Sequence, residues 1–220
     1  MAALSRERIL ETAIRLADEH GIESLTMRKL GDALGVEAMS LYYHVASKAD
    51  LVDAIVDSVV AEIELPLEEH DWRTAIRTYA IGAHEAFLRH PWACRLAMFP
   101  TSTRGARAPR VRDMEWLLRR LDEAGFPPEL TYSASHTLDS HIMGFTLWQL
   151  GHRAGASEAA GDDVAAFAAN FAQELRAAGY RHLADHVDQH LEAPDDAADR
   201  EFQFGLDLIL DGLERARRHV

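Results

Sequence analysis

Apolar side chains recur every three or four residues along almost the whole chain, and this spacing constrains the fold more than any other feature of the sequence. The period matches the α-helix, in which positions i, i+3, i+4 and i+7 share one face. No segment shows the alternation of apolar and polar residues that is typical of a half-buried strand, and none carries a hairpin turn. The sequence therefore predicts an all-α fold.

Composition limits where such a helical chain works. With 220 residues, 48% of them apolar, the chain is long enough for one large domain or for a small domain fused to a larger one. The single cysteine, Cys94, has no partner for an internal disulfide, which fits a reducing compartment. The start of the chain is charged from Arg6 onward, and no stretch reaches the roughly 20 apolar residues that cross a bilayer. We expect a cytoplasmic protein without a membrane segment.

Charge divides the chain into two parts. The net charge is −13, yet residues 1–48 carry six basic and seven acidic side chains, so nearly all of the excess lies beyond residue 48. An acidic surface repels phosphates, and only the near-neutral segment suits contact with DNA. We expect a small domain at 1–48 and a larger domain at 49–220.

The first part has the layout of three short helices. The first is predicted from Ser5 to His20, the second from Thr26 to Gly35, and the third from Glu37 to His44. A short helix, a tight turn and a second short helix make up a helix-turn-helix, which places its second helix in the major groove of DNA. Gly35 suits the positive φ of the turn. In this interpretation Val36 and Leu41 are buried, and Ala33 is small enough for close helix packing.

Polar and aromatic residues of this motif are expected to face outward. Thr26 and Lys48 stand at helix N-termini, where free backbone N–H groups and the helix dipole favour a phosphate. Arg28 is placed for a base edge or a phosphate. The outward positions of the third helix are Glu37, Ala38, Ser40, Tyr43 and His44.

Four stretches of the N-terminal segment (21–30, 34–36, 40–45 and 48–51) closely resemble the DNA-binding domain of the tetracycline-repressor family. The stretch 202–214 looks like the final dimerisation helix of that family's tetracycline-binding members. The resemblance implies a homodimeric, helical repressor that binds a palindromic double-stranded DNA operator and is released by a small-molecule effector, here of unknown identity. By position, it assigns DNA-facing roles to Thr26, Arg28, Glu37, Ala38, Met39, Ser40, Tyr42, His44 and Lys48.

Two positions depart from the family members that bind tetracycline. Those members carry Gln and Pro where this chain has Ala38 and Met39. Because alanine lacks the amide that pairs with adenine, we expect a different operator sequence.

Beyond Pro66 longer helices are predicted at 72–90, 110–124, 129–150, 162–178 and 197–217, with a brief piece after Pro91. A loop rich in Gly, Ala and Ser is expected at 151–161, and a turn-rich piece before Pro194. The helices at 129–150 and 197–217 are apolar on more than one face, so each needs a second partner. We expect them to pair with their symmetry mates in a four-helix dimer interface through Leu138, Ile142, Phe202, Leu206, Ile209 and Leu213.

Large apolar groups on the central helices, with a few polar ones, suit a pocket between bundle helices. One member of this set, His141, aligns with a pocket histidine in the resemblance to the tetracycline-repressor family. The expected ligand contacts are His84, Met114, Trp116, Thr137, His141, Phe145 and Gln149.

Two other functions remain open. His182, His186 and His190 share one helical face, and an i, i+4 pair of histidines is able to hold Zn²⁺ with Asp185 nearby, as in a metal sensor or metalloenzyme. The alternative for these histidines is a solvated helix face, and we assign no metal ligands. A dimeric ligand-binding protein without DNA binding is the other possibility. The sequence holds no nucleophile elbow, phosphate loop or other cofactor motif, so we expect neither a catalytic residue nor a cofactor.

Overall fold

The computed structural model describes residues 4–98, 108–160, 164–191 and 197–219, and every regular element in these ranges is a helix. This confirms the all-α prediction. The elements are α1 (Arg6–His20), a 3₁₀ turn η1 (Ile22–Ser24), α2 (Met27–Leu34), α3 (Ala38–Leu41), α4 (Lys48–Ala61), α5 (Trp72–Arg89), α6 (Pro91–Met98), α7 (Pro109–Glu123), α8 (Pro128–Ala160), α9 (Val164–Ala177), α10 (Arg181–Leu191) and α11 (Ala197–Arg218).

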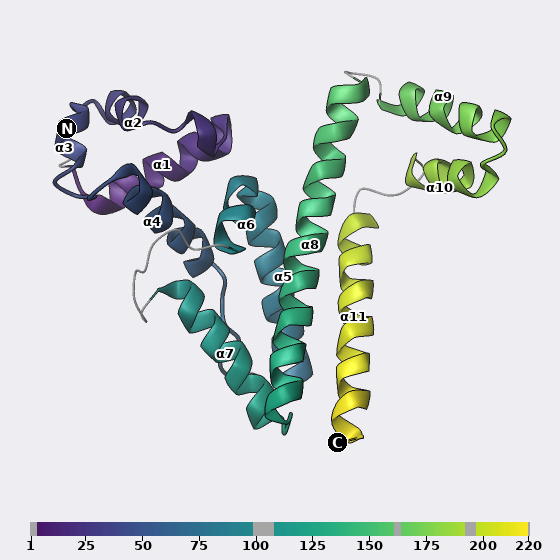
Figure 1. Cartoon of the computed structure of the whole chain (residues 1–220). Coiled ribbons are helices and arrows are strands. Elements are labelled where there is room, and N and C mark those ends of the chain that lie inside the picture. The colour runs from purple at the N-terminus through teal and green to yellow at the C-terminus, as the bar shows by residue number, and fades with distance from the viewer. Residues whose placement is uncertain (1–3, 99–107, 161–163, 192–196, 220) are drawn as a thin grey trace.

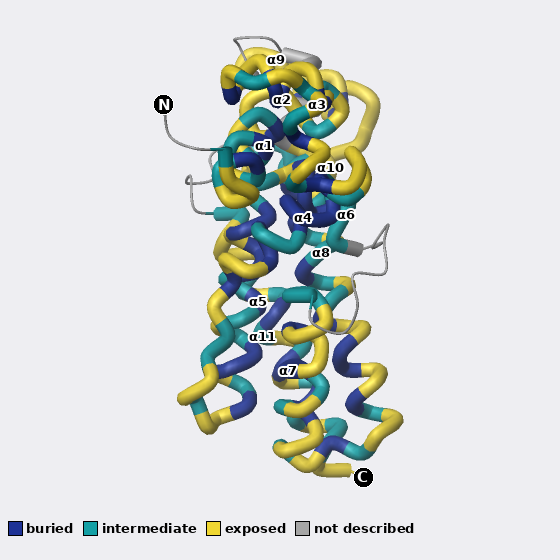
Figure 2. Tube along the Cα trace, turned by 90° about the vertical axis from the view of Figure 1, so that its left-hand side faces the viewer, coloured by how far each residue is buried: buried dark blue, intermediate teal, exposed yellow. Residues whose placement is uncertain are grey.

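The helices form a small group and a large group (Figure 1). Helices α1 to α3 lie together at one end, and α4 leads from them toward the larger group. There α5, α8 and α11 pack on one another, while α9 and α10 form a pair beside the far end of α8. Figure 2 shows buried and exposed stretches alternating along the long helices, as amphipathic helices require.

The predicted caps start the first helices. The Ser5 hydroxyl accepts a hydrogen bond from the Arg8 N–H at 3.2 Å, and Thr26 Oγ1 accepts from the Lys29 N–H at 3.1 Å. Each bond satisfies one of the backbone donors that the first turn of a helix leaves free. Gly35 ends α2 with φ 72° and ψ 32°, the left-handed conformation expected for it.

Close approach of α2 and α3 depends on Gly31 and not on Ala33. Ala33 is exposed, whereas Gly31 is buried where the chain turns back after α2. A Cβ at position 31 would lie 2.8 Å from the Val36 carbonyl oxygen and 3.2 Å from the Ala38 nitrogen. The expectation for Ala33 was therefore wrong, because the turn brings backbone, rather than a side chain, onto the buried side of α2.

Helix α4 begins with a reciprocal cap. Ser47 Oγ accepts from the Asp50 N–H at 3.0 Å, and Asp50 Oδ2 accepts from the Ala46 N–H at 3.1 Å. From this cap α4 runs between the two groups of helices and packs on α1, α5, α6 and α7. Asp57, near its C-terminal end, accepts from Arg110 Nε of α7 at 2.9 Å, with both side chains largely buried.

Two segments are more helical than predicted. Residues 151–160 continue α8, where a loop was expected, and residues 181–191 form α10, where turns were expected. Four residues of 151–160 are alanine, the strongest helix former, and they offset its two glycines. Within the described helices, none is long and apolar enough to cross a membrane.

A polar junction fastens the small group to the large one. Asp18, on α1, accepts from the Trp92 indole N–H at 2.7 Å and lies 2.9 Å from His90 Nδ1. The other ring nitrogen of His90 lies 3.5 Å from Glu62, just beyond the end of α4. One imidazole thus joins α1, the end of α4 and the turn between α5 and α6.

Replacing Gly31 by alanine should lower the free energy of unfolding by roughly 1–3 kcal/mol, because the new methyl group meets backbone that has no room to move. Gly82→Ala is the matched control, since nothing lies within 4 Å of its added Cβ, and it should gain up to about 1 kcal/mol of helix propensity. Urea unfolding followed by circular dichroism measures both. Equal stabilities for Gly31→Ala and the parent chain would contradict this account of the turn.

The junction at Asp18 is testable by a double-mutant cycle. Asp18→Ala, Trp92→Phe and the double variant should give an interaction energy of about 1 kcal/mol, because Asp18→Ala removes the acceptor and Trp92→Phe removes the indole donor. Denaturant unfolding of the four proteins supplies the energies. Strictly additive losses would mean that the two side chains do not stabilise each other.

Candidate functional site

The residues expected to face DNA lie on one accessible part of the small helical group. Thr26, Arg28, Glu37, Met39, Tyr42, Tyr43 and Lys48 are exposed, and Ala38, Ser40 and His44 are partly so. Tyr43 is 92% exposed. Aromatic side chains that pack on nothing in their own subunit are unusual, and adjacent ones mark a surface that contacts something else.

Helix α3 is shorter than predicted. Its α-helical part is Ala38–Leu41, and residues 42–44 form a turn instead of continuing to His44. The Leu41 carbonyl accepts from the N–H groups of both His44 and Val45, at 2.9 and 3.1 Å. This turn buries Leu41 and Val45 in the core and leaves Tyr42 and Tyr43 outside.

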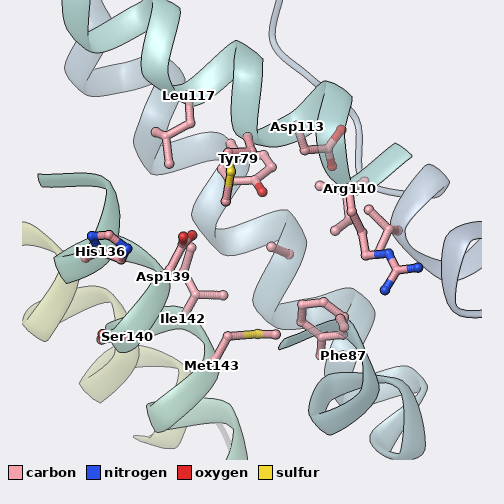
Figure 3. A pocket seen from close by; sticks show the side chains of 15 residues that line it. Tyr79, Phe87, Arg110, Asp113, Leu117, His136, Asp139, Ser140, Ile142 and Met143 are labelled. Carbon is pink, nitrogen blue, oxygen red and sulfur yellow. The ribbon is translucent and has the colours of Figure 1, made fainter. Parts of the chain in front are cut away.

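The larger group of helices encloses a cavity of about 500 Å³ between α4, α5, α6, α7 and α8 (Figure 3). Most of its wall is apolar, including Phe87, Leu117 and Met143. This volume is large enough for a drug-sized organic molecule. Its polar lining consists of Tyr79, Arg110, Asp113, His136, Asp139 and Ser140.

Two of these polar groups have atoms that the fold leaves unsatisfied. Asp113 is 2% exposed, and its Oδ1 accepts from Arg112 Nε at 2.8 Å, while Oδ2 has no hydrogen-bond partner among the described residues. Arg110 uses Nε for Asp57, and its buried Nη1 has no partner in the part of the chain that the structure describes. Unpaired buried polar atoms are costly, so their presence on a cavity wall indicates a ligand that bonds to them.

Burial changes the acidity of three groups on the wall. Desolvation raises the pKa of Asp113 above its ordinary value, against the hydrogen bond and charge of Arg112. Desolvation likewise raises the pKa of Asp139, with His136 acting in the opposite direction. The pKa of the Tyr79 phenol is raised chiefly by burial and then by the charges of Asp113 and Asp139. Tyr79 thus remains a neutral hydrogen-bond donor that lies within the field of both carboxylates.

Of the seven residues expected to contact a ligand, Met114 lines this cavity. The other six do not line it. Trp116 lies in the core and borders a second, wider depression, and Gln149 is buried on α8. Thr137 is exposed and donates to the Ser133 carbonyl, while Phe145 packs against the core.

Both expected histidine contacts hold the helices together instead. The Thr146 hydroxyl donates to the Ile142 carbonyl, so His84 Nδ1, 2.7 Å from Thr146 Oγ1, must donate to it. His141 Nε2 donates to the Phe202 carbonyl at 2.9 Å. A Cβ at Gly205 would lie 2.6 Å from the His141 ring, so this bond needs glycine there.

Sequence reasoning missed Tyr79, Asp113 and Asp139. A signal for them existed, because Asp113 stands four residues before Leu117 on the apolar face of its helix, and Asp139 directly follows the buried Leu138. A carboxylate on a buried face requires a reason, and here the reason is the cavity.

The residues expected at a dimer interface lie mostly inside the subunit. Leu138, Ile142, Phe202, Leu206 and Leu213 are buried between α5, α8 and α11, and Ile209 is partly buried. The periodicity correctly indicated two apolar faces on α11, but the choice between them was wrong. Its outward face carries Phe204, 68% exposed, and Leu208, 55% exposed. Trp148 on α8 is also exposed.

The histidine face of α10 does not form a metal site with any other described residue. His186 and His190 lie with ring centroids 4.9 Å apart, and Trp148 meets His190 edge-on. Among the residues that the structure describes, no three His, Cys, Asp or Glu side chains are arranged to hold a metal ion. The geometry therefore does not favour a metal sensor or metalloenzyme.

Two family models match the chain. Residues 9–55 match the model of bacterial regulatory proteins of the tetR family, and residues 65–217 match that of the tetracyclin repressor-like C-terminal domain. The first range contains the helix-turn-helix, and the second contains nearly all of the cavity wall.

Relatives resemble the chain over its whole length. The tetracycline repressor protein class C of Escherichia coli is 30% identical over 220 residues, which cover 99% of this chain and 94% of that protein. An HTH-type transcriptional regulator of Saccharopolyspora erythraea is 32% identical over 174 residues, covering 76% of this chain and 72% of that one. The crystal structure of the Streptomyces coelicolor TetR family protein ActR with actinorhodin superposes with a TM-score of 0.74 at 26% identity, covering 98% and 99% of the two chains.

The fold, the exposed helix-turn-helix and these matches agree with one another along the whole chain. The resemblance found in residues 21–51 and 202–214 is thereby confirmed. The chain belongs to the tetR family of bacterial regulatory proteins.

Proposed function

We propose that this protein is a ligand-responsive transcriptional repressor, which binds a palindromic operator as a homodimer and is released by a small molecule in the cavity. One observation carries the proposal: α4 belongs to both sites. Lys48, its first residue, lies beside the helix-turn-helix, and Val60, near its last turn, lines the cavity. A ligand that contacts Val60 therefore acts on the same helix that positions the surface for DNA.

The DNA contacts of the proposal are the ten residues of the exposed surface. In this arrangement α3 enters the major groove, and Tyr42 and Tyr43 reach base edges there. Thr26 and Lys48 bind phosphates at helix N-termini. A two-fold axis would set the half-sites roughly one helical turn, about 34 Å, apart. Because its operator is chromosomal or plasmid DNA, such a regulator works in the cytoplasm.

Effector control is supported by relatives that are described with bound molecules. ActR is described in complex with actinorhodin, and a TetR variant from Acinetobacter baumannii in complex with minocycline. For this chain we propose a role in binding, not in catalysis. A coupling free energy of about 1–3 kcal/mol between the two sites changes operator affinity roughly 5- to 150-fold.

The dimer of the proposal is formed by the outward faces of α8 and α11. Phe204 and Leu208 on α11 are more than half exposed, and Trp148 on α8 is partly exposed beside His190. Two such helices from each subunit make a four-helix interface. The division at residue 48 remains a proposal, with α4 as the connection between a DNA-binding domain at 1–48 and a ligand-binding and dimerisation domain at 49–220.

In the variant Tyr42→Ala the ratio of affinities for operator and scrambled DNA should fall at least about tenfold. The side chain reaches base edges and takes no part in the core, so only DNA binding should change. Fluorescence anisotropy with the intergenic DNA beside the gene measures the preference, and light scattering should show an unchanged dimer. Tyr180→Ala, at another exposed tyrosine, in the larger domain, is the control. Retained operator affinity in Tyr42→Ala would disprove the DNA-binding assignment.

The variant Leu208→Glu should be monomeric and lose operator binding, since burying an unpaired carboxylate in the interface costs about 2 kcal/mol or more of association free energy. Multi-angle light scattering across a dilution series gives the molar mass. Leu183→Glu, at an exposed leucine of α10, should remain dimeric. A dimeric Leu208→Glu variant would place the interface on another face.

A further inference from the structure

The charge balance of the cavity singles out Asp139. Arg110 is paired with Asp57, and Arg112 with Asp113, so these two cations and two carboxylates neutralise one another. Asp139 has neither a hydrogen bond nor an ion pair within the described part of the chain, and His136 acts on its pKa only through space. With Asp57 and Arg112 counted as partners from outside the wall, Asp139 is the cavity carboxylate that no described arginine balances.

The position of this carboxylate is suited to a ligand. Asp139 projects from α8 into the cavity toward Tyr79 of α5 (Figure 3). Asp113 faces the same space from α7, with its unpartnered Oδ2 almost fully buried. Asp139 makes this part of the wall negative, because Arg112 already balances Asp113 and the phenol donates a hydrogen bond without supplying charge.

The rest of the wall limits the shape of a ligand. Ile63, Phe87, Leu117 and Met143 form a mainly hydrophobic enclosure around this negative site. An apolar body replaces water favourably there, and aromatic faces also attract cations. An anionic ligand would be repelled by the unbalanced Asp139, and a fully polar ligand would leave the apolar wall without a partner.

We propose that the cavity binds a cationic amphiphile: an apolar, ring-bearing body with a protonated amine that pairs with Asp139 and lies beside Tyr79. The inference rests on the proposed function only in treating this ligand as the effector. The ligand supplies the counter-ion that no described residue gives Asp139, and the charge of this carboxylate is balanced once the site is filled.

Three small probes of equal shape and different charge test the proposal: 1-naphthylmethylamine, 1-naphthylmethanol and 1-naphthoate. Titration calorimetry on the full chain without DNA should show the amine binding about tenfold or more tightly than the alcohol, and the naphthoate most weakly. In Asp139→Asn the preference for the amine should disappear, while Asp122→Asn, an exposed carboxylate on α7, should keep it. Asp139→Asn should also unfold no more easily than the parent chain, because it removes an unpaired charge from a partly buried position.

Equal affinity for amine and alcohol, a preference that survives Asp139→Asn, or no binding of any probe would each overturn the inference. Operator release is measured separately by anisotropy. Amine-selective binding that depends on Asp139 but leaves operator affinity unchanged would uphold the ligand class and disprove effector control. Release of operator by the naphthoate alone would uphold effector control and disprove the ligand class.

Discussion

Helix α4 is buried along most of its length, against α1 at one side and against α5, α6 and α7 at the other. The two helical groups are therefore connected by a helix that packs on both of them, and not by a flexible linker. Its first turn is fixed by the Ser47 and Asp50 cap, and its last turns are fixed by the Asp57 pair with Arg110. Because a hydrogen-bonded helix bends little, a change of a few tenths of an ångström at one end must be taken up by packing at the other.

Local features of the fold were predictable from the sequence. Ser5 and Thr26 start helices as expected, since a cap depends on residues within one turn. Features that depend on distant contacts were not. The choice of Gly31 over Ala33 as the point of close approach depends on where the Val36 carbonyl lies, and the choice of inward face on α11 depends on α5 and α8.

The two sites also differed in how far the sequence predicts them, because one depends on local contacts and the other on distant ones. The surface proposed for DNA contact is continuous in sequence, from Thr26 to Lys48, so a motif predicted which side chains are exposed. The cavity is assembled from five helices over more than 80 residues, and of the predicted contacts only Met114 lines it. His84 and His141 were attractive candidates because imidazoles often bind ligands, yet each is engaged in a bond between helices that periodicity does not reveal.

The contact of His141 with α11 also has an evolutionary consequence. The imidazole occupies the space where a side chain at position 205 would stand, and it bonds to the carbonyl three residues earlier. The two positions can therefore not drift independently. A lineage that replaces Gly205 must first exchange the ring at 141 for something smaller, and a lineage that loses the ring is free to fill the gap. Position pairs of this kind should covary across descendants of this chain, and would report the α8 and α11 register without any structure.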